Sequence, residues 1–195
     1  MKIINITLFS SLIIFLLTAT FFTFCTPLFA QDYKVKKVGK TLSHPWGISV
    51  FDNNEVLVTE RRGNLFKVNI KTGLSIKIRN LPEVFNNRQG GLLDVLVDKK
   101  SISERNVYIC YSSKVIGGSS TSLLVGTIKN NELTNKKVLF RANNVSASSV
   151  HFGCRLAIVD NEIFMSIGDR GNRYEAQNIK SHAGSIIRIN KINGS

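Results

Sequence analysis

A recurring pattern of short apolar runs most constrains the fold of this chain. After residue 31, runs rich in Val, Ile, Leu, Phe and Tyr are separated by Asn, Asp and Gly. No segment there sustains an apolar period of 3.6 residues, so the pattern predicts strands rather than helices. The expected strands are 46–51, 55–60, 64–69, 74–79, 91–97, 106–112, 122–129, 136–140, 153–158, 162–167 and 184–190.

The strands recur in larger units. GNLFKVNIKTG at 63–73 has the same pattern as GSIIRINKING at 184–194, and ISVFDNNEVLVTE at 48–60 resembles LAIVDNEIFMSIG at 156–168. A period of roughly 51–56 residues with four strands per unit is typical of a β-propeller. A β-sandwich is the alternative, but a sandwich predicts no such repeat. We therefore expect an all-β propeller.

The strand count predicts just under three blades, near 39–80, 88–141 and 150–195. The first two units have four strands each and the third has three. Closed propellers have about 4–8 blades. Residues 31–195 are thus expected to form only part of a propeller ring.

The N-terminal residues 1–30 differ from the rest. Lys2 is their only charge, and residues 3–24 are almost wholly apolar. A basic start, an apolar core and a small residue, Ala30, before a polar start predict a cleaved secretory signal. An uncleaved anchor is the alternative, because about 20 apolar residues can span a bilayer. Either way, we expect the remainder to be periplasmic or secreted, with membrane contact only if the segment stays uncleaved.

The net charge of +13, from 26 Lys and Arg against 13 Asp and Glu, is scattered along the chain. A nucleic-acid binder would gather this charge on one face or in blocks. We therefore expect a solvated basic surface and no nucleic-acid partner.

Three cysteines are too few for a disulfide-stapled small domain. Cys110 lies in the apolar run VYICYS, which favours a buried thiol. In an oxidising compartment, pairing of Cys110 with Cys154 is the alternative.

Five motifs follow one another in an order that resembles a known family. Together they look like the N-terminal half of the soluble, PQQ-dependent aldose sugar dehydrogenases of the glucose/sorbosone dehydrogenase family, over residues 39–195. The motifs are LSHPWGISV at 42–50, LVTERRGNLFKV at 57–68, RQGGLLDVLVD at 88–98, VHFGCRLAI at 150–158 and GDRGNRYEAQNIKSHAGSIIRIN at 168–190.

The resemblance implies a secreted, six-bladed β-propeller, with about three four-stranded blades in this chain. It also implies oxidation of the anomeric hydroxyl of an aldose to a lactone. The hydride would pass to PQQ, a calcium ion would polarise the quinone, and an external acceptor would take up the electrons.

His151 occupies the position of the family's catalytic base. Histidine suits that role because its ordinary pKa lies near neutral pH. Packing beside Phe152 is the structural alternative. Gln89, in RQGGLL, matches the family's cofactor-contacting glutamine, and Gly90 and Gly91 would let the backbone turn there.

The GDRGNR segment lies where the family places an Arg-Asn pair on the cofactor. PQQ carries three carboxylates, so cations and amides suit its site. Here the order is reversed, as Asn172-Arg173, with Arg170 close by. All three are candidate cofactor ligands, and a plain polar turn is the alternative.

Other residues of the motifs are expected to support the fold. Arg155 is expected to pair with a carboxylate such as Asp169, and Asp94 to form a turn or to link two blades. Structural roles are expected for Trp46, packed between blades, and for His44 and His182, which flank turns.

The later half of the family's sequence, which supplies further cofactor contacts, has no counterpart in these 195 residues. Calcium ligands are therefore not assigned. A non-catalytic propeller that binds a sugar or a protein is the alternative function. Two copies closing one six-bladed ring is a further hypothesis, which we rank below a truncated gene product or sequence fragment.

Overall fold

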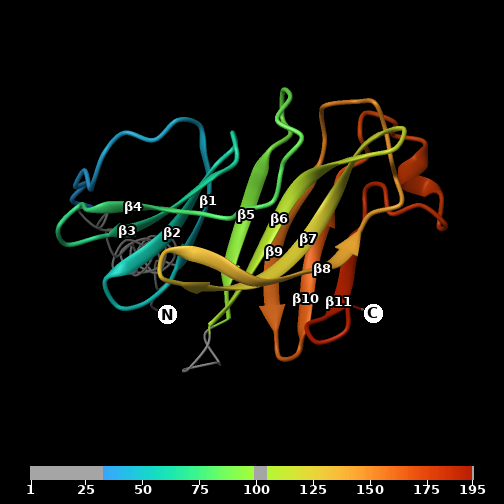
Figure 1. Cartoon of the computed structure of the whole chain (residues 1–195). Helices are drawn as coiled ribbons and strands as arrows, with labels where there is room; N and C mark the ends of the chain where they lie inside the picture. The colour runs from blue at the N-terminus through green and yellow to red at the C-terminus, as the bar shows by residue number, and fades with distance from the viewer. Residues whose placement is uncertain (1–32, 99–104, 195) are drawn as a thin grey trace, which may run out of the picture. The chain divides into compact units, whose positions relative to one another are not determined.

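The computed structural model describes residues 33–98 and 105–194 (Figure 1). The chain divides into two units, 1–37 and 38–195, and every described strand belongs to the second. The predicted export segment, residues 1–30, lies outside the described residues. Within the described part, no helix is long and apolar enough to cross a membrane.

The described strands form three antiparallel sheets, each a meander in chain order. The first sheet contains β1 (Pro45–Val50), β2 (Glu55–Glu60), β3 (Asn64–Asn69) and β4 (Ser75–Ile78). The second contains β5 (Leu92–Val97), β6 (Asn106–Val115), β7 (Gly118–Lys129) and β8 (Glu132–Arg141). The third contains β9 (Gly153–Val159), β10 (Glu162–Ile167) and β11 (Ile186–Asn190), and a short 3-10 turn, Glu175–Gln177, precedes β11.

This arrangement confirms the predicted all-β fold, with two four-stranded units and one three-stranded unit. The second sheet lies between the other two, and the leading strands β1, β5 and β9 are neighbours (Figure 1). This is the arrangement expected of consecutive propeller blades.

The hairpin β6–β7 is longer than predicted. The predicted strands ended at residue 112 and began again at residue 122, but the pairing continues to Val115 opposite Gly118. The serines of this polar run are buried in the sheet, and the Oγ atoms of Ser113 and Ser122 are 2.8 Å apart. Hydroxyl pairing across the strands satisfies these polar groups, so the run can stay in the sheet.

Two apolar cores lie between the sheets. Alternate residues of each strand point to opposite faces, so the second sheet can contribute to both cores. The core between the first and second sheets includes Leu57, Leu65, Ile78, Leu92 and Val95. The core between the second and third sheets includes Leu93, Leu123, Leu156, Met165 and Ile189.

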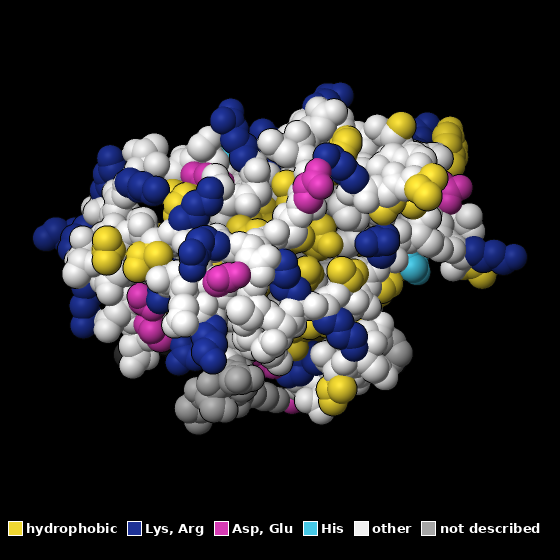
Figure 2. All heavy atoms as spheres, viewed as in Figure 1, with side chains coloured by type: hydrophobic (Ala, Val, Ile, Leu, Met, Phe, Trp, Pro, Cys, Tyr) yellow, Lys and Arg dark blue, Asp and Glu magenta, His cyan; other side chains and the backbone are white. Residues whose placement is uncertain are grey.

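Apolar side chains remain exposed on the two outer sheets. Ile48 of β1 is 66% exposed, and Ile186 of β11 is 73% exposed. Trp46, which we expected to pack between blades, is 44% exposed. Lys and Arg side chains are spread over the face seen in Figure 2, which agrees with the scattered charge of the sequence.

A disulfide joins Cys110 of β6 to Cys154 of β9, with their Cα atoms 5.7 Å apart. The prediction of a buried free thiol was therefore wrong, although both residues are indeed buried. The local apolar run could not reveal the pairing, because it arises from the packing of β6 against β9.

Candidate functional site

The candidate site is built on the unusual backbone of residues 151–154. His151, Gly153 and Cys154 all have left-handed conformations, with φ of 51°, 74° and 80°. Gly168 packs directly against this segment, because a Cβ there would lie 1.9 Å from the carbonyl oxygen of His151. Non-glycine residues in this region carry strain, so the surrounding structure must hold the segment in place.

His151 forms a close pair with Asp169. Its Nδ1 lies 2.7 Å from Asp169 Oδ1, and its side chain is 54% exposed. An ionised carboxylate only accepts hydrogen bonds, so a neutral His151 carries its proton on Nδ1. Nε2 is then left as a proton acceptor. This is the arrangement that a general base needs.

The carboxylate of Asp169 is stabilised in its charged form. The backbone N–H of Gly171 donates to Asp169 Oδ1 at 2.9 Å. That bond, followed by the one from His151, lowers the pKa of Asp169 below its ordinary value. Asp169 therefore stays ionised beside His151 at neutral pH.

Arg155 pairs with a carboxylate, as predicted, but its partner is not Asp169. Arg155 Nη1 instead donates to Asp94 Oδ1 at 3.2 Å, and the N–H of Leu156 donates to Asp94 Oδ2 at 2.9 Å. Asp94 is thus the blade-to-blade partner that we expected. Burial raises its pKa, and the bonds from Leu156 and Arg155 partly offset that effect.

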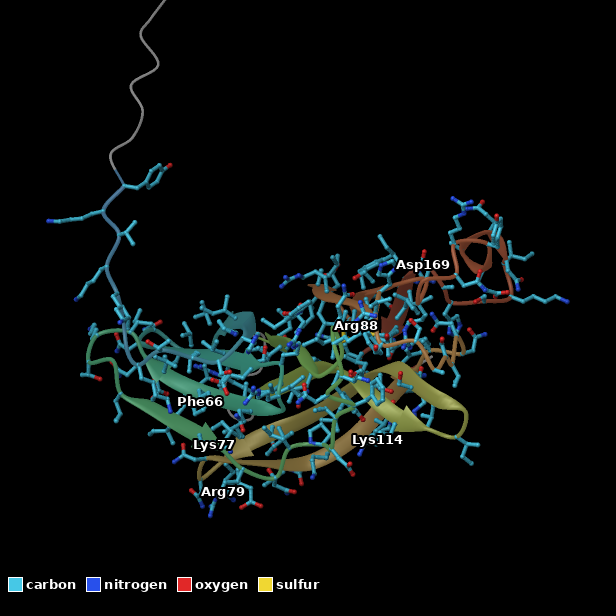
Figure 3. All side chains as sticks on the ribbon, turned by 90° about the horizontal axis from the view of Figure 1, so that it is seen from above. Phe66, Lys77, Arg79, Arg88, Lys114 and Asp169 are labelled. Carbon is cyan, nitrogen blue, oxygen red and sulfur yellow. A yellow bond between two sulfur atoms is a disulfide. The ribbon has the colours of Figure 1, made fainter. Side chains whose placement is uncertain are left out.

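The structure brings Gln89 together with His151. The side-chain Oε1 of Gln89 accepts the backbone N–H of His151 at 2.8 Å. The following glycines are required by close approaches: a Cβ would lie 2.5 Å from Phe85 O at Gly90 and 1.8 Å from Arg61 O at Gly91. Figure 3 shows Arg88, which precedes Gln89, near the middle of the structure and Asp169 above and to the right of it.

Arg61 is a candidate that sequence reasoning missed. It lies against Gly91, and its Nε is buried without a hydrogen-bond partner in the described structure. We counted Arg61 among the scattered surface charges, and only its packing against RQGG distinguishes it.

Arg170 points inward rather than toward solvent. It is 3% exposed and stacks on Phe152, with its guanidinium carbon 3.8 Å from the ring centroid. Its N–H groups donate to the carbonyls of Val150, Ser119 and Ser148, and burial lowers its pKa to about 10. Arg170 thus stabilises the segment before His151 from its buried side. Cofactor contact by Arg170 stays a prediction.

Asn172 and Arg173 lie on the exposed turn that follows Asp169. The N–H of Asn172 donates to the carbonyl of Asp169 at 2.9 Å, and Arg173 Nη2 donates to Tyr174 OH at 3.3 Å. Asn172 also borders a cavity of about 380 Å³ between residues 143–146 and 169–183. Both residues are accessible for the predicted cofactor contact, which stays a prediction.

The remaining histidines stay close to the backbone of neighbouring turns. His182 Nδ1 accepts the N–H of Asn143 at 3.0 Å, and burial lowers the pKa of His182. The carbonyl of His44 accepts the N–H of Arg61 at 3.1 Å. These contacts agree with the structural roles expected for both.

The donor set fits an anionic cofactor better than it fits a metal. Gln89 supplies an amide, Arg61 a half-buried guanidinium whose Nε has no hydrogen-bond partner, and Arg173 an exposed cation. These are the groups that bind carboxylates. By contrast, residues 33–98 and 105–194 contain no group of three or more His, Cys, Asp or Glu placed to hold a metal ion. No calcium ligand is therefore assigned among these residues.

Comparisons with known proteins show which family and which fold this chain resembles. Residues 42–195 match the family model described as Glucose / Sorbosone dehydrogenase. Uncharacterized protein slr1608 of Synechocystis is 33% identical over 82% of this chain and 43% of its own length. The aldose sugar dehydrogenase YliI of Escherichia coli is 29% identical over 76% of this chain and 41% of its own length.

Solved structures share the fold. A glucose dehydrogenase superposes with a TM-score of 0.73 at 31% identity, over 79% of this chain and 49% of that one. The apo-form of the E. coli aldose sugar dehydrogenase gives 0.71 at 29% identity, over 77% and 45%. The PQQ-bound aldose sugar dehydrogenase of Streptomyces coelicolor gives 0.70 at 22% identity, over 82% and 48%. The chain thus spans less than half the length of each.

Proposed function

The chain belongs to the glucose/sorbosone dehydrogenase family, and from this premise we propose that it carries part of the active site of a PQQ-dependent aldose sugar dehydrogenase. The observation that supports this most is the pairing of an exposed His151 with Asp169, directly beside Gln89. The name of the E. coli relative supports an aldose substrate, and the PQQ-bound neighbour supports the cofactor.

His151 is the proposed general base. Its Nε2 would take the proton from the anomeric hydroxyl of the sugar as the C1–H bond breaks. Asp169 accepts from Nδ1 and so favours the imidazolium that forms. Placing a general base against the hydroxyl is worth roughly 10²–10⁴ in rate.

Gln89, Arg61 and Arg173 are the proposed holders of the cofactor. Arg61 and Arg173 would bind carboxylates, and Gln89 would both contact the cofactor and fix the backbone of His151. PQQ, when bound, supplies the oxidant that accepts the hydride. The sugar loses two electrons and two protons and becomes a lactone, and an external acceptor takes the electrons.

Export of the chain is part of the proposal. The apolar segment 1–30 supports it, and so does the Cys110–Cys154 disulfide, since such bonds persist in oxidising compartments. Fractionation of bacterial cells expressing the chain, with mass measurement of its N-terminus, tests both parts. Recovery in the cytoplasm with reduced cysteines would contradict them.

A dye-linked oxidation assay tests the activity. The folded chain is mixed with glucose, calcium and a redox dye, with and without PQQ. We expect dye reduction only with PQQ, together with formation of the lactone. If the folded chain shows no turnover, the enzymatic proposal fails. Glucose binding without turnover would instead support the non-catalytic propeller.

A further inference from the structure

The strained segment 151–154 is fixed at its C-terminal end by a covalent bond to the neighbouring sheet. Cys154, three residues after His151, has a φ of 80° and is joined to Cys110 of β6. Both cysteines are almost fully buried. The disulfide thus holds Cys154 in a left-handed conformation that non-glycine residues rarely adopt.

The other contacts of the segment are non-covalent, and they include the packing of Phe152 in the core and against Arg170. Thr121 Oγ1 donates to the carbonyl of Phe152 at 2.8 Å, and Asp94 Oδ2 accepts the N–H of Leu156 at 2.9 Å. At the N-terminal end, Gln89 Oε1 accepts the N–H of His151. Each of these hydrogen bonds stabilises the segment by about as much as one left-handed residue strains it. The disulfide is the strongest constraint among these contacts.

The partner of His151 comes from elsewhere in the third sheet. Asp169 follows β10, whereas Cys110 belongs to the second sheet. Within the third sheet, the N–H of Gly168 donates to the carbonyl of Phe152 and the N–H of Arg170 to the carbonyl of His151, which joins the segment to the turn that carries Asp169. The disulfide joins the same segment covalently to the second sheet. A shift of about 1 Å at a reacting group can cost about 10²-fold in rate.

We propose that the Cys110–Cys154 disulfide positions His151 for its contact with Asp169, and does more than stabilise the fold. The geometric part of this inference stands on the described contacts alone. Its consequence for turnover rests on the proposed function.

The test replaces the disulfide with the pair Cys110→Ser and Cys154→Ser in the full chain. The matched control is Thr59→Val, which removes a buried bond of 2.5 Å to Leu93 O between the first and second sheets. The first readout is the downfield NMR signal of the His151 Nδ1–H, identified by its loss in His151→Gln. The second is the separation of kcat from KM.

We expect the imidazole N–H signal to disappear in the double variant and to persist in Thr59→Val. We also expect kcat to fall about 10–100-fold in the double variant while KM changes by less than about threefold. Persistence of the signal in the double variant would overturn the inference. Should that variant fail to fold, Cys110→Val with Cys154→Ala fills the same core without a crosslink and is measured in its place. Absence of turnover in the unaltered chain would refute the proposed function, while the NMR comparison would still decide this inference.

Discussion

His44 and His151 occupy the same place in two repeats of the molecule. Each lies just before the leading strand of its sheet, with φ of 52° and 51°. The carbonyl of each accepts a backbone N–H from the turn after the second strand, Arg61 for His44 and Arg170 for His151. Their side chains differ: His44 Nδ1 lies 3.2 Å from Ser43 Oγ, whereas His151 Nδ1 faces the carboxylate of Asp169.

The repeat thus supplies the backbone position of the histidine, and the site adds the carboxylate of Asp169. The propeller repeat places an exposed histidine at the head of both sheets. Only in the third sheet does an ionised carboxylate orient the ring and leave Nε2 as a proton acceptor. The comparison implies that Asp169, rather than the backbone position, makes His151 suited to catalysis.

Replacing the two histidines gives the largest expected effect. His151→Gln should lower kcat by roughly 10²–10⁴-fold, because it removes the general base. His44→Gln, at the matched position, should leave kcat within about threefold. Steady-state kinetics of both variants checks this, and equal losses would show that the histidines are not functionally distinct.

Removing only the carboxylate tests what distinguishes the two positions. Asp169→Asn should lower kcat by about 10²-fold, since the amide can present a donor to Nδ1 and favour the wrong tautomer. Because the folded pKa of Asp169 is lowered, its contribution to stability is present above its ordinary pKa and lost as pH falls through the folded value. The difference in Tm between the parent and the variant should therefore shrink in acid, and a constant difference would contradict the pairing.

The two junctions between sheets should differ in the free energy of unfolding. Cys110→Ser with Cys154→Ser opens a loop with a sequence separation of 44 residues and should cost about 3–4 kcal/mol. Thr59→Val at the first junction should cost about 1–2 kcal/mol. Urea unfolding measures both values, and a larger cost for Thr59→Val would reverse the expected ranking.

The smallest expected effect concerns Asp94. Its folded pKa is raised, so its favourable contribution is present below its unfolded pKa and is lost as pH rises through the folded pKa. Relative to Asp94→Asn, the parent chain should therefore gain stability as pH falls, opposite in sign to Asp169. Tm measured across acidic pH checks this, and the same slope for both carboxylates would contradict the assignment of their environments.

The strands and their repeat were predictable because both follow from the spacing of short apolar runs along the chain. His151 and Gln89 were predicted as site residues from the motifs that carry the family resemblance. The disulfide, the Asp169 pairing and the inward turn of Arg170 were not, since each depends on how separate sheets pack. Arg155 illustrates this: the sequence indicated a carboxylate partner, and only the packing of β9 against β5 selects Asp94.

Following the anomeric carbon of the substrate tests the central claim most directly. The folded chain, supplied with PQQ, calcium and a redox dye, is incubated with glucose labelled with ¹³C at C1, and the products are read by NMR. The account predicts conversion of C1 to the lactone, with one two-electron equivalent of dye reduced for each sugar, and loss of this conversion in His151→Gln but not in His44→Gln. Dye reduction without oxidation of C1, or undiminished conversion by His151→Gln, would contradict it.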